Sequence, residues 1–242
     1  MSKLLILNWK MNPETLKKAI ALARASDFKN AVVAPPFTFL EEAEKVLKKA
    51  ELGAQDLFWE EKGAFTGEVS AKELKNAGVK YVIIGHSERR HKLGETDEMI
   101  AKKLKAAVKN GLTPVLCVGE TKKEKDAGKK EEVLNSQLKI GLSPLTQSSK
   151  LKAQSLLIAY EPVWAIGTGD PETPESALET IKFIKTILNS KFHILNLKVL
   201  YGGSVNSKNL ADYLKFKEIN GVLVGSASLN KDEVRKMAAL LK

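Results

Sequence analysis

The sequence predicts a single-domain (β/α)8 barrel that covers residues 1–242. Eight times along the chain a short apolar run precedes a longer amphipathic segment, and this βα alternation is typical of a parallel sheet. The runs are continuously apolar, as expected of strands covered on both faces. The length of 242 residues suits such a barrel, and no Pro/Gly/Ser-rich linker divides the chain. A doubly wound sheet is the alternative, but no G-x-G-x-x-G motif follows the first strand.

The eight apolar runs are the predicted strands. The third is the weakest signal, because only a few apolar residues precede a long polar connection that contains Gly63 and Gly67. The predicted strands are 4–7, 31–34, 52–55, 81–85, 113–118, 156–160, 198–201 and 221–225.

Amphipathic segments with recognisable ends give the helices. Ser70 and Glu73 form a capping-box pattern, Gly111 is placed to end a helix, and Asn230 is placed to cap the last one. The predicted helices are 15–25, 39–50, a short helix after Ser70, 96–110, 121–141, 174–188, 209–214 and 231–241, with a polar turn region at 143–149.

Composition limits the classes of partner. The formal net charge is +10, but the lysines are scattered over amphipathic segments and not interleaved with aromatic residues, so we expect no nucleic acid partner. A general positive field still favours an anionic small molecule. The single cysteine, Cys117, fits a reducing compartment. With no leader pattern and no apolar run near the roughly 20 residues that span a bilayer, we expect a soluble, cytoplasmic protein without membrane contact.

The stretch 159–169 carries the first functional signal. Glu161 stands where the sixth strand should end, and Pro162 cannot continue strand pairing because it has no N–H. A mostly apolar tip follows, closed by Gly167 and Gly169, which is the composition of a mobile lid. By itself, a glutamate at a strand end is more often a solvated residue or a helix cap than a catalyst.

Other chemically active side chains fall at the same barrel end. Active sites of such barrels lie at the carboxyl ends of the strands, with a phosphate site at the turns after strands seven and eight. Taken singly, Lys10 could be a surface charge, His86 a satisfied strand-end histidine and the glycines simple turns. Together they supply a cation, an imidazole, a carboxylate and two turns rich in N–H groups. The residues predicted at the mouth are Asn8, Lys10, His86, Ser87, Glu88, Glu161, Gly202, Gly203, Ser204, Gly225 and Ser226.

This set can move a proton between adjacent carbons. A carboxylate can take the proton, while an imidazole N–H stabilises the charge that develops on a neighbouring carbonyl oxygen. With three histidines, one cysteine and no ligand spacing, the sequence predicts neither a metal nor a cofactor.

Six stretches closely resemble triosephosphate isomerase, and the resemblance runs over the whole chain. They are NWKMN (8–12), GAFTGE (63–68), GHSERR (85–90), AYEPVWAIGTG (159–169), YGGSV (201–205) and LVGSASL (223–229). The resemblance implies a barrel that interconverts dihydroxyacetone phosphate and D-glyceraldehyde 3-phosphate in glycolysis and gluconeogenesis, without cofactor. This family is itself the standard example of a carboxylate base paired with a neutral histidine.

The resemblance also implies residue roles. Glu161 would be the base, His86 the neutral electrophile, Lys10 the substrate-binding cation and Asn8 its hydrogen-bonding partner. Ser87 would help to fix the histidine through its backbone, and Glu88 would organise the local charges. The expected contacts to substrate and phosphate are Asn8, Lys10, Gly167, Ser204, Gly225 and Ser226.

Three departures from the family pattern are visible. Ser226 stands where the family usually has glycine, Asp170 and Pro171 replace the usual Lys-Thr at the end of the lid, and Asp56 replaces an asparagine. The loop Gly63–Glu68 carries the family's dimer contact, so the resemblance implies a homodimer through it.

Two other functions share parts of this pattern. A barrel that binds phosphorylated sugars without catalysis would not need Glu161 as a base. Another phosphosugar isomerase would use the same chemistry on longer aldose phosphates.

Overall fold

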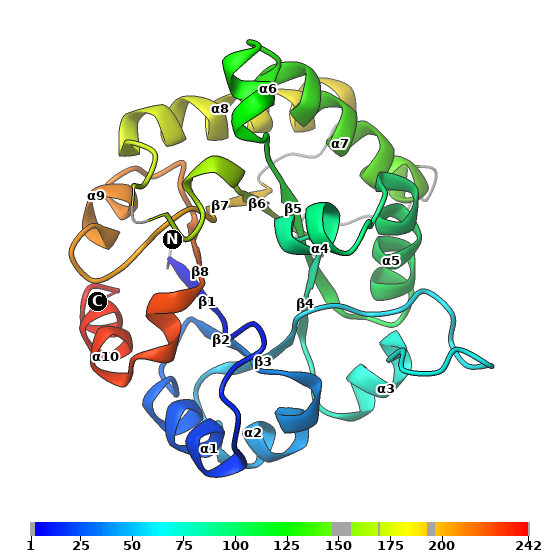
Figure 1. The fold of residues 1–242 in the computed structure, drawn as a ribbon, viewed down its shortest axis with the longest axis vertical. Helices are drawn as coiled ribbons and strands as arrows, with labels where there is room; N and C mark the ends of the chain where they lie inside the picture. Colours follow the sequence, from blue (N-terminus) through cyan, green and yellow to red (C-terminus); the bar gives the residue numbers. More distant parts are fainter. Residues whose placement is uncertain (1–2, 147–155, 169, 193–196, 242) are drawn as a thin grey trace.

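A computed structural model describes residues 3–146, 156–168, 170–192 and 197–241. Figure 1 shows the strands in a central ring with helices around it. The strands form a closed barrel in sequence order, and each pairs in parallel with the next until β8 meets β1. They are β1 (Leu4–Asn8), β2 (Ala31–Ala34), β3 (Glu51–Ala54), β4 (Tyr81–Ile84), β5 (Thr113–Val118), β6 (Leu157–Tyr160), β7 (Lys198–Tyr201) and β8 (Gly221–Val224).

Ten α-helices are described between and after the strands, and their bounds confirm most of the expected segments. They are α1 (Leu16–Ala25), α2 (Leu40–Val46), α3 (Ala71–Asn76), α4 (Ser87–Lys92), α5 (Asp97–Lys109), α6 (Lys122–Asp126), α7 (Lys130–Thr146), α8 (Pro174–Phe192), α9 (Leu210–Leu214) and α10 (Lys231–Ala239). The Ser70–Glu73 capping box and the Asn230 N-cap are both present. None of the helices in the described ranges could cross a membrane.

Strand alternation divides the apolar side chains into two layers. Ile6 lies inside the barrel, whereas its neighbours Leu5 and Leu7 pack against the helices. The same alternation places Cys117 in the barrel interior, where it is fully buried. The inner layer consists of Ile6, Val32, Ala34, Ile83, Val115, Cys117, Leu157, Ala159, Leu200 and Leu223. This packed interior fixes the eight strand ends that carry the site.

Two expectations about the chain between β5 and β6 are wrong. Residues 121–141 are not one helix, because Gly128 adopts φ 70° and separates α6 from α7. Helix α7 also continues through 143–146, which were expected to be a turn; residues 147–149 of that turn lie outside the described residues. The Ser143 hydroxyl donates to the Ile140 carbonyl, the acceptor that Pro144 inside the helix cannot use.

Candidate active site

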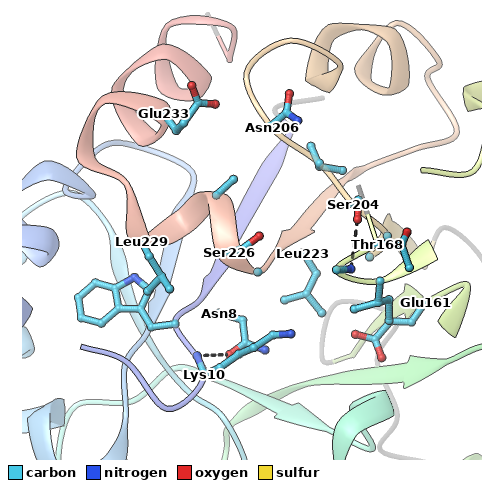
Figure 2. A pocket seen from close by; sticks show the side chains of 18 of the residues that line it. Asn8, Lys10, Glu161, Thr168, Ser204, Asn206, Leu223, Ser226, Leu229 and Glu233 are labelled. Atoms are coloured by element: carbon cyan, nitrogen blue, oxygen red, sulfur yellow. Dashed lines mark hydrogen bonds between the residues drawn. The ribbon is translucent and has the colours of Figure 1, made fainter. Parts of the chain in front are cut away.

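A cavity of about 720 Å³ opens at the carboxyl ends of the strands. Figure 2 shows Lys10, Glu161, Ser204 and Ser226 around it, although they come from four different strand ends. Of the residues predicted at the site, those lining the cavity are Asn8, Lys10, His86, Glu161, Gly167, Gly202, Gly203, Ser204, Gly225 and Ser226. The two supporting residues, Ser87 and Glu88, are adjacent to His86 on α4 and contact members of this set.

Glu161 follows β6 and is only 2% exposed. Its Oε2 accepts a 2.9 Å hydrogen bond from the Ser87 N–H. Its Oε1 lies 3.2 Å from Nε2 of His86, but the two groups are not aligned as a hydrogen bond, so Oε1 has no hydrogen-bond partner in the described chain. A buried acceptor that the protein leaves unpaired in a cavity is available to a ligand.

Glycines make room for Glu161. A Cβ atom on Gly119 would lie 1.7 Å from the Glu161 carbonyl oxygen, and one on Gly202 would lie 2.9 Å from Glu161 Cγ. A side chain at Gly119 would displace the Glu161 backbone, and one at Gly202 would displace its side chain.

His86 is the N-cap residue of α4, and its Nδ1 accepts a 3.3 Å hydrogen bond from the Glu88 N–H. Since Nδ1 accepts, this tautomer carries its proton on Nε2, the atom that faces Glu161. The Arg90 side chain holds the preceding turn, because it donates to the carbonyls of Gly85 (2.7 Å) and Cys117 (3.0 Å).

Ser87 and Glu88 bind two different residues of the site. The Ser87 N–H binds the carboxylate of Glu161 and not the imidazole, which differs from the role expected for it. The Glu88 Oε1 accepts a 2.7 Å hydrogen bond from Lys10 Nζ. Helix α4 was not expected from the sequence, yet its first turn organises both sides of the site.

Lys10 is held in an unusual backbone conformation with φ 53°. The Asn8 Oδ1 accepts from its N–H at 3.0 Å, and Gln55 Nε2 donates to its carbonyl at 2.8 Å. Gln55 also donates to the Ala34 carbonyl at 2.9 Å, so one amide ties the ends of β1 and β2 together. No motif in the sequence indicates this role, because Gln55 acts through backbone carbonyls that only the barrel brings near it.

Gly167, Ser204, Gly225 and Ser226 line the other end of the cavity. The Gly167 N–H donates to Ser204 Oγ at 3.2 Å, and this hydroxyl donates to the Ala165 carbonyl at 2.7 Å. Ser204 thus joins the turn after β7 to the lid, which is the loop between β6 and α8. A Cβ on Gly203 would lie 2.2 Å from the Tyr201 hydroxyl, so this turn also requires glycine.

The first half of the lid is anchored by Glu120, a fully buried residue after β5. Its carbonyl accepts from the Val163 N–H at 3.0 Å, and its Oε1 accepts from Trp164 Nε1 at 2.9 Å. Burial raises the pKa of the Glu120 carboxyl, although the hydrogen bond from Trp164 opposes that rise. Sequence reasoning missed Glu120, which stands in no motif.

In the described ranges, no three His, Cys, Asp or Glu side chains are grouped as a metal site requires. The described residues at the mouth offer a carboxylate, an imidazole, an ammonium group and backbone N–H groups.

Comparison with known proteins agrees with this geometry. The family model described as triosephosphate isomerase matches residues 3–241. The chain belongs to the triosephosphate isomerase family. The triosephosphate isomerase of Aquifex aeolicus is 43% identical over 98% of both chains, and that of Dictyoglomus thermophilum is 44% identical over 94% of both. The crystal structure of triosephosphate isomerase from Bartonella henselae matches 99% of both chains with a TM-score of 0.87 and 34% identity.

Within a triosephosphate isomerase framework, the Ser226 departure is structurally mild. Ser226 begins the 3-10 helix η4 (Ser226–Leu229), and in the described chain only Lys10 and Asn30 have positive φ among the non-glycine residues. The position therefore does not require glycine. At the lid end, Asp170 N–H donates to Thr168 Oγ1 at 3.1 Å.

The Asp56 departure creates a buried charge cluster. Asp56 accepts from Lys103 Nζ at 2.6 and 2.7 Å and forms an ion pair with Arg89 Nη2 at 2.9 Å, and Glu95 pairs with both cations. Desolvation raises the pKa of Asp56 to about 6, despite the opposing effect of Lys103. Arg89 lies on α4, so the cluster supports the helix that carries Ser87 and Glu88.

Proposed function

We propose that this member of the family interconverts dihydroxyacetone phosphate and D-glyceraldehyde 3-phosphate, with Glu161 as the base and His86 as the electrophile. The observation that carries the proposal is that Glu161 Oε1 and His86 Nε2 line one cavity and lie 3.2 Å apart. A three-carbon substrate can therefore meet both groups at neighbouring atoms.

The reaction moves one proton between neighbouring carbons and one proton between the oxygens that those carbons carry. Glu161 takes the proton from the carbon next to the carbonyl, and the electron pair becomes the C=C bond of an enediolate. The Nε2–H of His86 donates to the carbonyl oxygen as negative charge develops on it. The Nε2 proton of His86 passes to the former carbonyl oxygen, and the imidazole regains a proton from the hydroxyl on the neighbouring carbon. The protonated Glu161 then returns its proton to the adjacent carbon, which gives the other isomer.

Substrate binding is assigned to the remaining polar groups. Lys10 supplies a positive charge, and Asn8 and Gln55 hold its backbone in place. We assign the phosphate to Gly167, Ser204, Gly225 and Ser226, where backbone N–H groups and hydroxyls can approach its oxygens. The net charge of +10 favours the approach of this anion.

The lid protects the intermediate. An enediolate next to a phosphate can expel that phosphate, and exclusion of water with a firm hold on the phosphate suppresses this loss. The tip suits the task, because Ala165 is buried and Ile166 lines the cavity.

A coupled assay on the purified protein tests the proposal. D-glyceraldehyde 3-phosphate is supplied, and dihydroxyacetone phosphate is removed by an NADH-dependent dehydrogenase whose absorbance change is followed. Binding of phosphate ligands without turnover would instead indicate the non-catalytic barrel. Turnover of longer aldose phosphates at a similar kcat/KM would indicate another phosphosugar isomerase.

We also infer that the enzyme acts as a homodimer through the loop Gly63–Glu68. Figure 1 shows the connection between β3 and α3 projecting from the barrel. It carries Phe65, which is 44% exposed and contacts the ring of Phe58 at a tilt (4.8 Å between ring centroids). Met11, after β1, is 93% exposed. Large apolar side chains exposed in this way favour a protein partner. Sedimentation analysis of the protein and of Phe65→Asp tests this: a dimer is expected, shifted toward monomer by the substitution.

The reaction places this enzyme in glycolysis and gluconeogenesis, and hence in the cytoplasm. Its substrate partner is a triose phosphate, and neither a nucleic acid nor a membrane is part of the proposal.

A further inference from the structure

Both ends of the lid meet the chain that follows β5. At the first end, Glu120 binds Val163 and Trp164, as described above. In addition, Lys125 of α6 places its ammonium nitrogen 3.2 Å from the centroid of the Trp164 ring. The first end is thus held by one carboxylate and one cation from residues 120–125.

The second end carries a buried carboxylate of its own. Glu172 lies just before α8 and is 3% exposed. It accepts from Lys130 Nζ at 3.4 Å and from the Ser176 hydroxyl at 2.6 Å, and its other oxygen has no hydrogen-bond partner in the described chain. Lys130, the first residue of α7, also donates to the Thr180 hydroxyl at 3.1 Å. A carboxylate this deeply buried depends on its few partners.

The backbone of Glu172 is tied to the opposite side of the lid. Its carbonyl accepts a hydrogen bond from the Tyr213 hydroxyl. The Tyr213 ring stacks on Tyr201, with 4.3 Å between centroids and 14° between planes. Tyr201 ends β7 directly before the turn in which Ser204 holds the lid tip. Glu172 is thereby connected through its carboxylate to the segment after β5 and through its carbonyl to the turn after β7.

Tyr160 links the two ends. Its hydroxyl donates to Glu120 Oε1 at 3.2 Å. Burial raises the pKa of this hydroxyl, and the charges of Glu172 and Glu120 raise it further, which agrees with both carboxylates lying close to it. One buried polar cluster thus contains Glu120, which holds the first end of the lid, and Glu172, which belongs to the second.

We propose that Glu172 and Lys130 are positioning residues that fix the second end of the lid to the same segment that fixes the first. When both ends of the lid are fixed, its movement is confined to the residues between them. These residues then close over the cavity as one unit. The inference rests on the proposed isomerisation, because its consequence is the fate of the enediolate. A lid with a loose second end releases more phosphate from that intermediate.

The test compares the unchanged protein with Glu172→Gln, Lys130→Gln and the double variant. Glu175→Gln is the matched control: it removes the same charge from an exposed neighbour on α8 that pairs with Lys215 at 3.2 Å. Inorganic phosphate released per isomerisation is measured for each. This ratio is independent of the fraction of folded enzyme, because both reactions need the same active sites.

We expect each single variant to raise the ratio about fivefold, the factor that one ordinary net hydrogen bond is worth. The double variant should match the single variants, since both remove one interaction. The control should stay within about twofold of the unchanged protein. An unchanged ratio in Glu172→Gln and Lys130→Gln, or effects that multiply in the double variant, would overturn the inference. If the unchanged protein does not isomerise triose phosphates, the proposed function fails and this inference fails with it.

Discussion

Glu161 Oε1 and His86 Nε2 face each other across 3.2 Å without an aligned hydrogen bond. Each group is oriented from behind by the first turn of α4: the Ser87 N–H binds Glu161 Oε2, and the Glu88 N–H binds His86 Nδ1. Two adjacent backbone N–H groups therefore aim the base and the electrophile at one volume.

Replacing His86 tests the electrophile. His86→Gln removes the Nε2–H that faces the developing oxyanion, so we expect kcat to fall by about 10²- to 10³-fold with a smaller change in KM. Steady-state kinetics in the coupled assay measure both. His91→Gln, an exposed position on the same helix, is the control. A fall in kcat of the same size in both variants would show that the effect is not specific to the site.

Replacing Lys10 tests the role of its charge. Lys10→Met keeps the length of the side chain and removes a charged donor, so we expect KM to rise by about 10- to 100-fold. The dependence of kcat/KM on ionic strength should also weaken, because one steering charge is gone. Lys18→Met, on the exposed face of α1, should change neither quantity. An unchanged KM would remove Lys10 from the binding site.

Ser226→Gly tests whether the phosphate site tolerates serine at the position where the family usually has glycine. Ser226 does not have a positive φ, so its backbone conformation is open to serine and glycine alike. Replacing serine by glycine should therefore not improve the phosphate site. We expect KM to change by less than about threefold and the free energy of unfolding to fall by up to about 1 kcal/mol. A tenfold improvement in KM would mean that serine strains the site.

Asp56 makes stability depend on pH in a defined direction. Its pKa is raised by burial from 3.8 to about 6, so its contribution to folding is present below pH 3.8 and is lost as pH rises through 6. Between those pH values, the stability of Asp56→Asn relative to the unchanged protein should increase by up to about 3 kcal/mol. Urea unfolding of both proteins across this range measures the difference. A relative stability that stays constant or decreases with rising pH would contradict it.

The sequence predicted most of the barrel because its signals are local. The strand 113–118 and the Ser70 cap depend on apolar runs and turn chemistry that lie next to each other in the chain. The motif glutamate and histidine could be placed together because the carboxyl ends of all strands meet at one face. Where a local signal was overlooked, at Gly128, one predicted helix became two.

The rest of the site depends on contacts between distant segments. Gln55 holds Lys10 through a carbonyl oxygen, and Glu120 holds Trp164 from the neighbouring strand end. The type and spacing of these two residues do not indicate such contacts, because the fold brings the partner group from a distant part of the chain. The partner of Ser87 was misjudged for the same reason: a backbone N–H can serve either of two nearby groups.

Turnover of D-glyceraldehyde 3-phosphate by Glu161→Asp, run in D₂O with the product analysed for deuterium, tests the central claim most directly. The substitution withdraws the carboxylate by one methylene, and a misplacement near 1 Å costs about 10²-fold in rate. We expect that loss, with deuterium still entering the product at the carbon that the shortened carboxylic acid protonates. A Glu161→Asp variant that turns over at the rate of the unchanged protein would show that another group is the base.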